Sequence, residues 1–376
     1  MRRKIASWSM LLLLLVSCRG NGVLSETSEG DTLQLHYAQH LQIVEHEGYT
    51  EAVLLNPWQA GRVLHRYYMV PKSEDSEEVS KLLEKRMDGD IVRTPVKRSV
   101  IFTAPHCQLL YELACEDAIK GVCDMQYIHA RQFDRSRVVD CGQAMQPMIE
   151  KIIDLHPEAL LASPYENSGG YGKLEHLGVP VIEAADYMET SPLGRAEWMK
   201  FYGRLFGCEQ RADSLFHAVD SAYQTLCEKA SKMPQGRSIL TERKTGNVWY
   251  TPGGQSTIGR MLADAHAAYP WAEDKHAGSL ALSAEQVVDR GEKIDVWAFK
   301  YIASKPLTRE DLLQEYAGYG QLKAFRNGEV YECNTDVEAF FDETGFHPDY
   351  LLRDFIILAH PEAGLGGLRY YKKIEP

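Results

Sequence analysis

The sequence lacks the motifs of the common enzyme and metal-binding classes. It contains no GxxxxGK[ST], GxSxG or HExxH, and no GxGxxG follows an expected strand. Neither CxxC nor a Cys/His zinc pattern occurs, and the eight-residue spacing of Cys107, Cys115 and Cys123 suits neither zinc nor an iron–sulfur cluster. We therefore expect no catalytic residue, no resident metal and no cofactor.

Positive charge and long apolar runs are also scarce. The 41 Lys and Arg residues stand against 53 Asp and Glu, so the formal net charge is -12. This negative field argues against a nucleic-acid partner, because it would repel the phosphates. The apolar run at 10–16 is too short to span a bilayer, and a composition with 44% apolar and 25% charged residues is that of a globular protein.

The first 18 residues have the pattern of a lipoprotein signal. A basic start, Arg2 to Lys4, leads into the run at 10–16 and then Leu15-Val16-Ser17-Cys18, which is typical of a lipobox. We predict a signal peptide at 1–17, a diacylglycerol on the Cys18 thiol and a flexible tether at 18–32. The protein would then be anchored at a membrane, facing the periplasm or the cell exterior. A simple secretion signal with a chance cysteine, or a short membrane anchor, is the alternative.

The seven other cysteines are odd in number, so they cannot all pair within the chain. We expect them to be small buried side chains, with one disulfide at most among them. They are Cys107, Cys115, Cys123, Cys141, Cys208, Cys227 and Cys333.

The first half of the chain predicts β-structure followed by an α/β lobe. Apolar and polar side chains alternate at 42–45 and 67–70, which favours a hairpin or small sheet, and the acidic segment 72–90 is expected to be a surface loop or exposed helix. Residues 33–96 thus form an N-terminal β extension. Within 97–190, strands are expected at 100–102, 119–122, 159–162 and 179–183, and helices at 106–114, 146–155 and 171–177.

Residues 191–234 predict a helical section. Ser191 and Pro192 are typical of a helix start, and Gly207 of its end. Apolar residues then recur at spacings of three and four from about 209 to 231, a helix of about 35 Å that can bridge two domains.

Residues 235–376 predict a second α/β lobe. Strands are expected at 237–240, 247–250 and 294–299, helices at 256–267, 283–289 and 348–361, and a hairpin at Asn327-Gly328 between 322–325 and 330–331. The predicted fold class is therefore α/β, with two lobes of mostly parallel sheet joined by a long interdomain helix and a small N-terminal β extension.

Four segments follow one another in a specific order. They are ETSPLGRAEW at 189–198, WYTPGGQSTIG at 249–259, LSAEQV at 282–287 before DVW at 295–297, and HPDYLLRD at 347–354 before HPE at 360–362. This order resembles the class of ABC-importer substrate-binding proteins that capture ferric siderophores, haem and cobalamin, over about residues 97–362. The resemblance implies a single small chelate held between the lobes, with an ABC permease and its ATPase as partners.

The resemblance also implies one exposed glutamate on each lobe that docks onto arginines of the permease. Glu285, within SAEQV, matches the glutamate of the second lobe. Glu166 is the candidate in the first lobe, with Glu175 behind it, although the residues at 167–170 alter the local spacing.

The ligand is expected at the carboxyl ends of the strands, where open α/β sheets bind ligands. Aromatic rings there can stack on a porphyrin, corrin or catecholate, a histidine can ligate or hydrogen-bond, and a lysine can neutralise a carboxylate. Each of these side chains is equally suited to core packing. The candidates are His106, Tyr165, Trp249, Tyr250, Lys300 and Tyr301, with Pro105 and Pro164 beside them.

We therefore expect a lipid-anchored binding protein without catalysis that delivers an iron chelate, haem or cobalamin to an ABC permease. Two alternatives remain: a surface lipoprotein that passes the chelate to an outer-membrane receptor, and a chelatase-like enzyme on a related scaffold. The negative total charge disfavours a highly anionic siderophore, unless a local cluster of Arg or Lys lines the cleft.

The lipobox generates a direct prediction. Replacing Cys18 with Ala should block lipidation, because the diacylglycerol is attached through the thiol. The chain should then leave the membrane fraction or accumulate as uncleaved precursor. Metabolic labelling with a fatty-acid analogue measures the effect, and unchanged labelling of the variant would contradict the assignment.

Overall fold

The computed structural model describes residues 30–74, 79, 81, 88–166 and 170–375. The predicted signal peptide, Cys18 and most of the predicted tether lie outside the described residues. No helix within the described residues is long and apolar enough to cross a bilayer.

The N-terminal extension is a five-stranded sheet, which agrees with the small sheet rather than the hairpin of the two expected structures. Its strands pair in sequence order, antiparallel except for the parallel pair β4 and β5. The first strand contains Asp31 and Thr32, which the sequence assigned to the tether; both pair with β2, so the extension begins earlier. The strands are β1 Asp31–Thr32, β2 Leu41–His46, β3 Tyr49–Leu55, β4 Val63–Pro71 and β5 Asp90–Thr94.

The first lobe has a parallel sheet, as the sequence predicted, and its strands lie in the order β12-β11-β6-β7-β8. The predicted helix at 146–155 begins later, because Gln146–Pro147 pairs as strand β10 with β9, Gly142–Gln143. The segment expected as a helix at 171–177 is a 3-10 helix, Gly172–Leu177. The other elements are β6 Ser99–Ile101, α2 Ala104–Glu112, β7 Ile119–Val122, β8 Val139–Asp140, α3 Ile149–Asp154, β11 Ala159–Ala162 and β12 Val181–Glu183.

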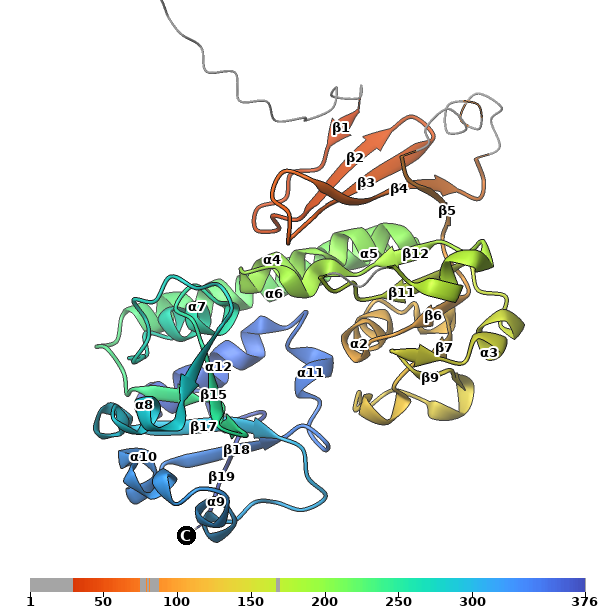
Figure 1. Ribbon diagram of the computed structural model, residues 1–376. Coiled ribbons are helices and arrows are strands. Elements are labelled where there is room, and N and C mark those ends of the chain that lie inside the picture. The colour runs from red at the N-terminus through yellow and green to blue at the C-terminus, as the bar shows by residue number, and fades with distance from the viewer. Residues whose placement is uncertain (1–29, 75–78, 80, 82–87, 167–169, 376) are drawn as a thin grey trace, which may run out of the picture.

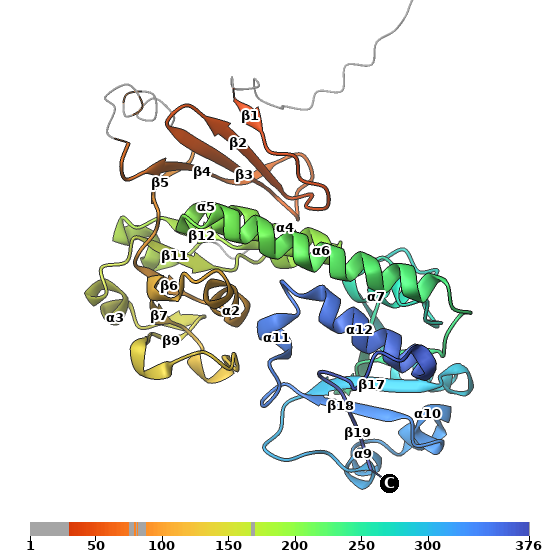
Figure 2. The ribbon, with the colours of Figure 1, turned by 180° about the vertical axis from the view of Figure 1, so that it is seen from behind.

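Three helices form the section between the lobes. The Ser191 hydroxyl accepts a hydrogen bond from the Gly194 amide and begins α4, Pro192–Glu197. The expected single helix is interrupted at Trp198, which is fully buried, and α5, Met199–Phe206, follows. The long helix α6, Glu209–Ser231, has the predicted bounds and extends from beside α5 to above α12 in the second lobe (Figures 1 and 2).

The second lobe contains two sheets. One has the order β13-β17-β18-β19, with its first three strands parallel, and the other is the antiparallel ribbon β14-β15-β16. The strands are β13 Ile239–Thr241, β14 Lys244–Thr245, β15 Val248–Pro252, β16 Ser279–Ser283, β17 Val296–Tyr301, β18 Val330–Asn334 and β19 Lys372–Lys373. The helices are α7 Thr257–Asp264, α8 Ala284–Val288, α9 Arg309–Glu315, α10 Lys323–Arg326, α11 Phe340–Glu343 and α12 Pro348–Ala359.

The hairpin predicted around Asn327-Gly328 is wrong. Residues 323–326 form the helix α10, and β18 pairs in parallel with β17 rather than with the preceding segment. Gly328 has a positive φ of 70°, a conformation that suits the end of a helix as well as a hairpin turn. The Asn-Gly pair therefore terminates a helix whose buried face carries Ala324 and Phe325.

All seven cysteines in the described residues are free thiols. Cys107, Cys123, Cys141 and Cys333 are buried, as expected, and burial raises the pKa of Cys123 to about 12. Cys115 and Cys208 lie with their sulfur atoms 3.1 Å apart.

The N-terminal extension is held by two buried carboxylates, Glu189 just before the helical section and Glu197 within it. The Glu197 carboxylate accepts the backbone N–H groups of residues 36, 37 and 38 at 2.8–3.0 Å. The Glu189 carboxylate accepts those of residues 39 and 40 at 2.9–3.0 Å, and also the Trp198 indole N–H. Glu189 is 2% exposed and Glu197 is 0% exposed. The sheet therefore lies against the helical section (Figure 1), and Tyr67 of β4 also hydrogen-bonds to Val181 and Glu183 of β12 in the first lobe.

The Glu197 carboxylate should be essential for stability. Glu197→Ala should lower the free energy of unfolding by about 3 kcal/mol or more, because several buried N–H groups lose a charged acceptor. Glu197→Gln retains one acceptor oxygen and should lose less. Urea unfolding measures both, with the exposed Glu209→Ala as control. A Glu197→Ala variant as stable as the control would contradict this account.

Candidate ligand-binding cleft

A cavity of about 320 Å³ lies between the two lobes. From the first lobe it is lined by residues that follow β6 and β7. From the second lobe it is lined by residues that follow β17 and β18, and by α11. The carboxyl ends of parallel strands from both lobes therefore meet at one cavity, which is where such sheets bind ligands. The lining residues are Phe102, Thr103, Ala104, Pro105, Asp124, Tyr127, His129, Ile302, Thr335, Phe341 and Asp342.

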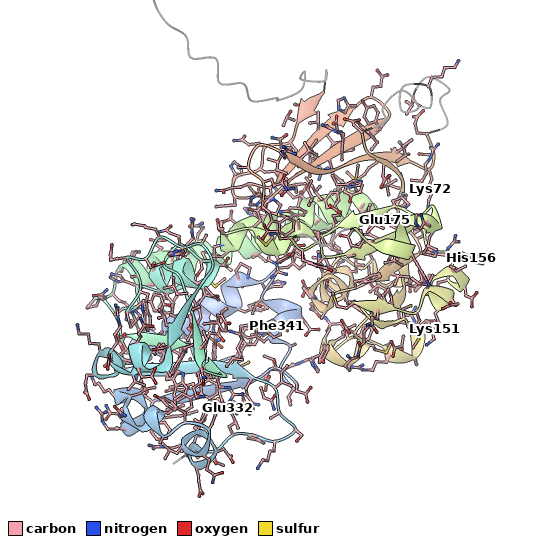
Figure 3. The ribbon with its side chains drawn as sticks, in the orientation of Figure 1. Lys72, Lys151, His156, Glu175, Glu332 and Phe341 are labelled. Carbon is pink, nitrogen blue, oxygen red and sulfur yellow. The ribbon has the colours of Figure 1, made fainter. Side chains whose placement is uncertain are left out.

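A second cavity, of about 780 Å³, continues along the first lobe. It shares Phe102, Thr103 and Asp124 with the first cavity and adds Tyr165 and Lys173, among others. We refer to the two cavities together as the interlobe cleft. Figure 3 shows the half-exposed Phe341 in the space between the lobes.

One carboxylate of α11 joins the two sides of the cleft. Asp342 is 1% exposed, and its Oδ1 accepts the backbone N–H groups of His129 and Ala130, at 3.0 and 3.1 Å, across the lobe boundary. Burial raises the pKa of Asp342. Its Oδ2 and the Nε2 of His129 have no hydrogen-bond partner among the described residues.

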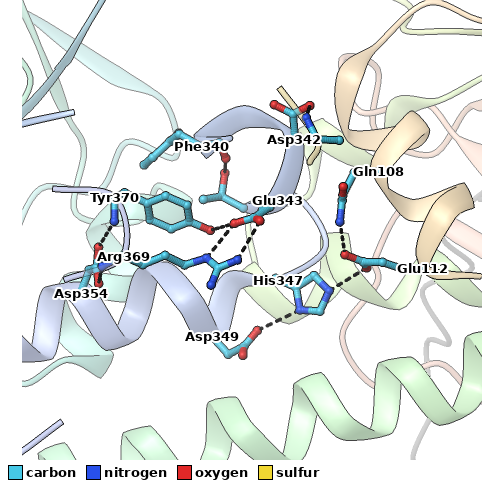
Figure 4. Close-up of polar contacts among 12 residues, drawn as sticks. Gln108, Glu112, Phe340, Asp342, Glu343, His347, Asp349, Asp354, Arg369 and Tyr370 are labelled. Carbon is cyan, nitrogen blue, oxygen red and sulfur yellow. Dashed lines mark hydrogen bonds and ion pairs between the residues drawn. The ribbon is translucent and has the colours of Figure 1, made fainter. Parts of the chain in front are cut away.

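A second polar contact joins the lobes beside the cleft (Figure 4). His347, at the start of α12, lies 2.8 Å from Glu112 at the end of α2, and 3.6 Å from Asp349. Burial opposes protonation of the ring, but hydrogen bonds with Asp349 and Glu112 outweigh it and raise the pKa of His347 to about 9. Gln108 also donates to Glu112.

The C-terminal segment fixes α11 in this position. Arg369 donates two hydrogen bonds of 2.7 Å to the Glu343 carboxylate, and the Tyr370 hydroxyl donates a third at 2.9 Å. The backbone N–H groups of Arg369 and Tyr370 are in turn accepted by Asp354 of α12. The C-terminal segment therefore holds α11, the helix that carries Asp342, in place, as Figure 4 shows.

Two of the six predicted ligand contacts line cavities. Tyr165, with 48% of its surface exposed, lines the interlobe cleft, as does Pro105. Tyr250, with 50% exposed, lines a separate cavity of about 360 Å³ in the second lobe, together with Glu242 and Arg243.

The predicted site residue His106 belongs to a buried network on the helical section. Its Nε2 lies 2.9 Å from both the Asp186 carboxylate and the Tyr202 hydroxyl, and Asp186 also pairs with Arg195 at 2.9 Å. Burial of Asp186 opposes its ionisation, but His106 and Arg195 hold its pKa down at about 2. His106 thus joins α2 to the helical section.

The remaining three predicted contacts lie within the second lobe. Trp249 is fully buried and packs against Trp297 and Tyr319, with ring centroids 5.8 and 5.6 Å apart. Tyr301 is buried, and Lys300 forms an ion pair with Glu242. Neighbouring residues of a strand face opposite ways, which is why Trp249 points inward and Tyr250 outward.

The sequence reasoning missed His129, Phe341 and Asp342. The strand-end rule, applied to the correctly predicted strand at 119–122, would have pointed to the loop that carries Asp124 and His129. Nothing in the sequence pattern marks α11, because it is a four-residue helix placed by contacts with Arg369 and Tyr370.

The two candidate docking glutamates are exposed. Glu285 lies in the first turn of α8, which Ser283 and Gln286 cap reciprocally. Hydrogen bonds from its own backbone N–H and from Ser283 lower the pKa of Glu285. Glu166 directly follows the loop after β11, and the Glu175 carboxylate instead accepts the Tyr171 N–H.

Comparison with known proteins supplies a family and a fold. A family model described as periplasmic binding protein matches residues 100–337. An uncharacterized lipoprotein of Methanocaldococcus jannaschii is 25% identical over 357 residues, covering 91% of this chain and 87% of the relative. A periplasmic heme-binding protein of Pseudomonas aeruginosa has a TM-score of 0.60 at 16% identity, covering 75% of this chain and 99% of that one. A protein of an ABC-type Fe3+-hydroxamate transport system of Saccharomonospora viridis has a TM-score of 0.54 at 18% identity, covering 70% and 93%.

The burial of Trp249 predicts a core role in the ligand-free protein. Trp249→Ala should lower the free energy of unfolding by about 3–5 kcal/mol, because it removes a large ring from a packed cluster. Tyr250→Ala, on the opposite face of the same strand, should change it by about 0.5 kcal/mol or less. Urea unfolding measures the free energy of unfolding of both variants, and equal values for the two would contradict the core role of Trp249.

The raised pKa of His347 predicts a pH-dependent stability. The folded protein binds the proton more tightly than an ordinary histidine, whose pKa is about 6.5. The stabilisation is therefore complete below about pH 6.5 and is lost as the pH rises through about 9. The free energy of unfolding should fall by at most about 3 kcal/mol over this range.

Urea unfolding at pH 6 and pH 9.5 measures this loss. His347→Gln should remove it, whereas His276→Gln, at an exposed histidine, should retain it. An identical pH dependence in His347→Gln and the wild type would show that another group is responsible.

Proposed function

The chain belongs to the periplasmic binding protein family, and we propose that it is the substrate-binding lipoprotein of an ABC importer. It captures an iron chelate, such as a siderophore or haem, or a corrinoid such as cobalamin, and delivers it to the permease and its ATPase. The observation that carries this proposal is the cavity of about 320 Å³, to which both lobes contribute residues from strand ends.

The interlobe cleft supports ligand capture between the lobes. A ligand held there would contact residues after β6 and β7 on one side and α11 on the other. Tyr165 is proposed as a stacking contact on the first lobe and Tyr250 as a contact on the second, since both rings are half-exposed beside cavities. The other four candidates, His106, Trp249, Lys300 and Tyr301, are proposed to support the cleft loops from within.

Docking and anchoring complete the proposal. Glu285 and Glu166 would pair with arginines of the permease, one from each lobe, and the exposure of both side chains is compatible with this role. Cys18 would hold the protein at the extracytoplasmic face of a membrane. The name of the archaeal relative, a lipoprotein, supports the same location. No nucleic acid and no catalysis take part.

Two measurements test the proposal. Purified protein is titrated with haem, cobalamin and ferric siderophores while tryptophan fluorescence is followed, and at least one should bind. In proteoliposomes that contain its partner permease and ATPase, the Glu166→Ala/Glu285→Ala variant should retain ligand affinity but lose about tenfold or more in transport.

A matched control is Glu209→Ala/Glu310→Ala. Both residues are exposed glutamates in the first turn of a helix, as Glu285 is, and their loss should leave transport unchanged. Normal transport by the Glu166→Ala/Glu285→Ala variant would exclude docking by these residues. It would favour a surface lipoprotein that passes its ligand to an outer-membrane receptor. Failure of every ligand class to bind would remove the proposed function itself.

A further inference from the structure

The interlobe cleft is negatively charged at its centre. No lysine or arginine of the described lining neutralises the carboxylates there. Among the described residues that line the cavity between the lobes, Asp124 and Asp342 are carboxylates and none is Lys or Arg. The neighbouring cavity of the first lobe adds a single cation, the exposed Lys173. A ligand between the lobes therefore meets two carboxylates first.

Two cations of the second lobe are already held in ion pairs. Lys300, predicted to neutralise a ligand carboxylate, forms an ion pair with Glu242. Arg243 forms an ion pair with Glu315. An anionic ligand would have to break such pairs and leave Glu242 or Glu315 without its partner, which opposes binding.

Asp342 lines the cavity between the lobes and has one carboxylate oxygen without a partner among the described residues. Its Oδ1 already accepts two backbone N–H groups of the first lobe, whereas its buried Oδ2 has no partner within the described part of the chain. A buried carboxylate oxygen without a partner is unfavourable, and a hydrogen-bond donor or a cation placed in the cavity would satisfy it. An anionic group would be repelled instead.

Apart from His129, whose Nε2 has no hydrogen-bond partner among the described residues, the rest of the lining is apolar or carries neutral hydroxyl groups. The apolar surface suits a ligand that presents a hydrocarbon exterior, and the hydroxyls of Thr103 and Thr335 can accept or donate hydrogen bonds. The apolar and aromatic members are Phe102, Ala104, Pro105, Tyr127, Ile302 and Phe341.

We propose that the cleft selects an uncharged or cationic metal chelate that carries amide or ammonium N–H donors, and that Asp342 Oδ2 accepts a hydrogen bond from it. This inference rests on the proposed function, because it takes the interlobe cleft as the ligand site. The same carboxylates repel chelates that are rich in carboxylate or catecholate groups.

The test uses pairs of closely related ligands in which one member carries an added carboxylate. The first pair is ferrioxamine B, which carries an ammonium group, and its N-succinyl derivative, which carries a carboxylate there. The second is cyanocobalamin and its monocarboxylic acid, in which one amide is hydrolysed. Haem and a ferric tris-catecholate are included as further anionic probes. The member without the added negative charge should bind at least tenfold more tightly.

Asp342→Asn tests the residue, because the amide oxygen can still accept the N–H groups of His129 and Ala130 while the negative charge is lost. Affinity for the cationic or neutral member should fall about tenfold, and the discrimination within each pair should shrink. Asp124→Asn should shrink it further. Asp213→Asn makes the same charge change at an exposed position on α6 and should leave the discrimination intact. Circular dichroism checks that each variant folds.

The outcomes separate the two proposals. If the anionic probes bind as tightly as their partners, or if Asp342→Asn leaves the discrimination unchanged, the charge selection is overturned while the proposed function stands. If no probe of either charge binds, the proposed function fails, and the inference about the cleft fails with it.

Discussion

Three buried carboxylates, two just before the helical section and one within it, hold the parts of this molecule together. Asp186, Glu189 and Glu197 are almost fully excluded from solvent, and a buried charge is tolerated only when donors surround it. Asp186 takes its donors from α2 of the first lobe, through His106, and from the helical section, through Tyr202 and Arg195. Glu189 and Glu197 take theirs largely from the backbone at 36–40 of the N-terminal extension. Segments far apart in the sequence are thereby fixed around one short stretch of helix.

The sequence predicts the elements that local periodicity determines. The helix at 209–231 and the strands at 119–122 and 159–162 appear with the expected bounds, since their apolar residues follow a single period. The error at 323–326 has a physical reason, because Asn-Gly suits a helix end as well as a hairpin. The choice between them depends on which strand β18 pairs with, and that partner, β17, comes from tertiary structure.

The position of the candidate site could be predicted from the sequence, but most of its residues could not. The strand-end rule led to the loops at Pro105 and Tyr165, which do line the interlobe cleft. It gave no information on which way a side chain turns, so Trp249 and Tyr250 were treated alike although they face opposite ways. Asp342 could not be predicted, because the short helix that carries it is positioned by Arg369 and Tyr370, which follow later in the sequence.

The hydrogen bonds between the extension and the helical section bear on where the folding unit begins. The family model starts at residue 100, yet the donors that satisfy Glu189 and Glu197 lie at 36–40. A shortened chain that kept only the family region would leave those carboxylates and the face around Trp198 uncovered. Loss of the extension during evolution would leave Glu189 and Glu197 without their donors, so both residues would have to be replaced at the same time. We therefore expect related chains to have the extension and the two glutamates together, or neither.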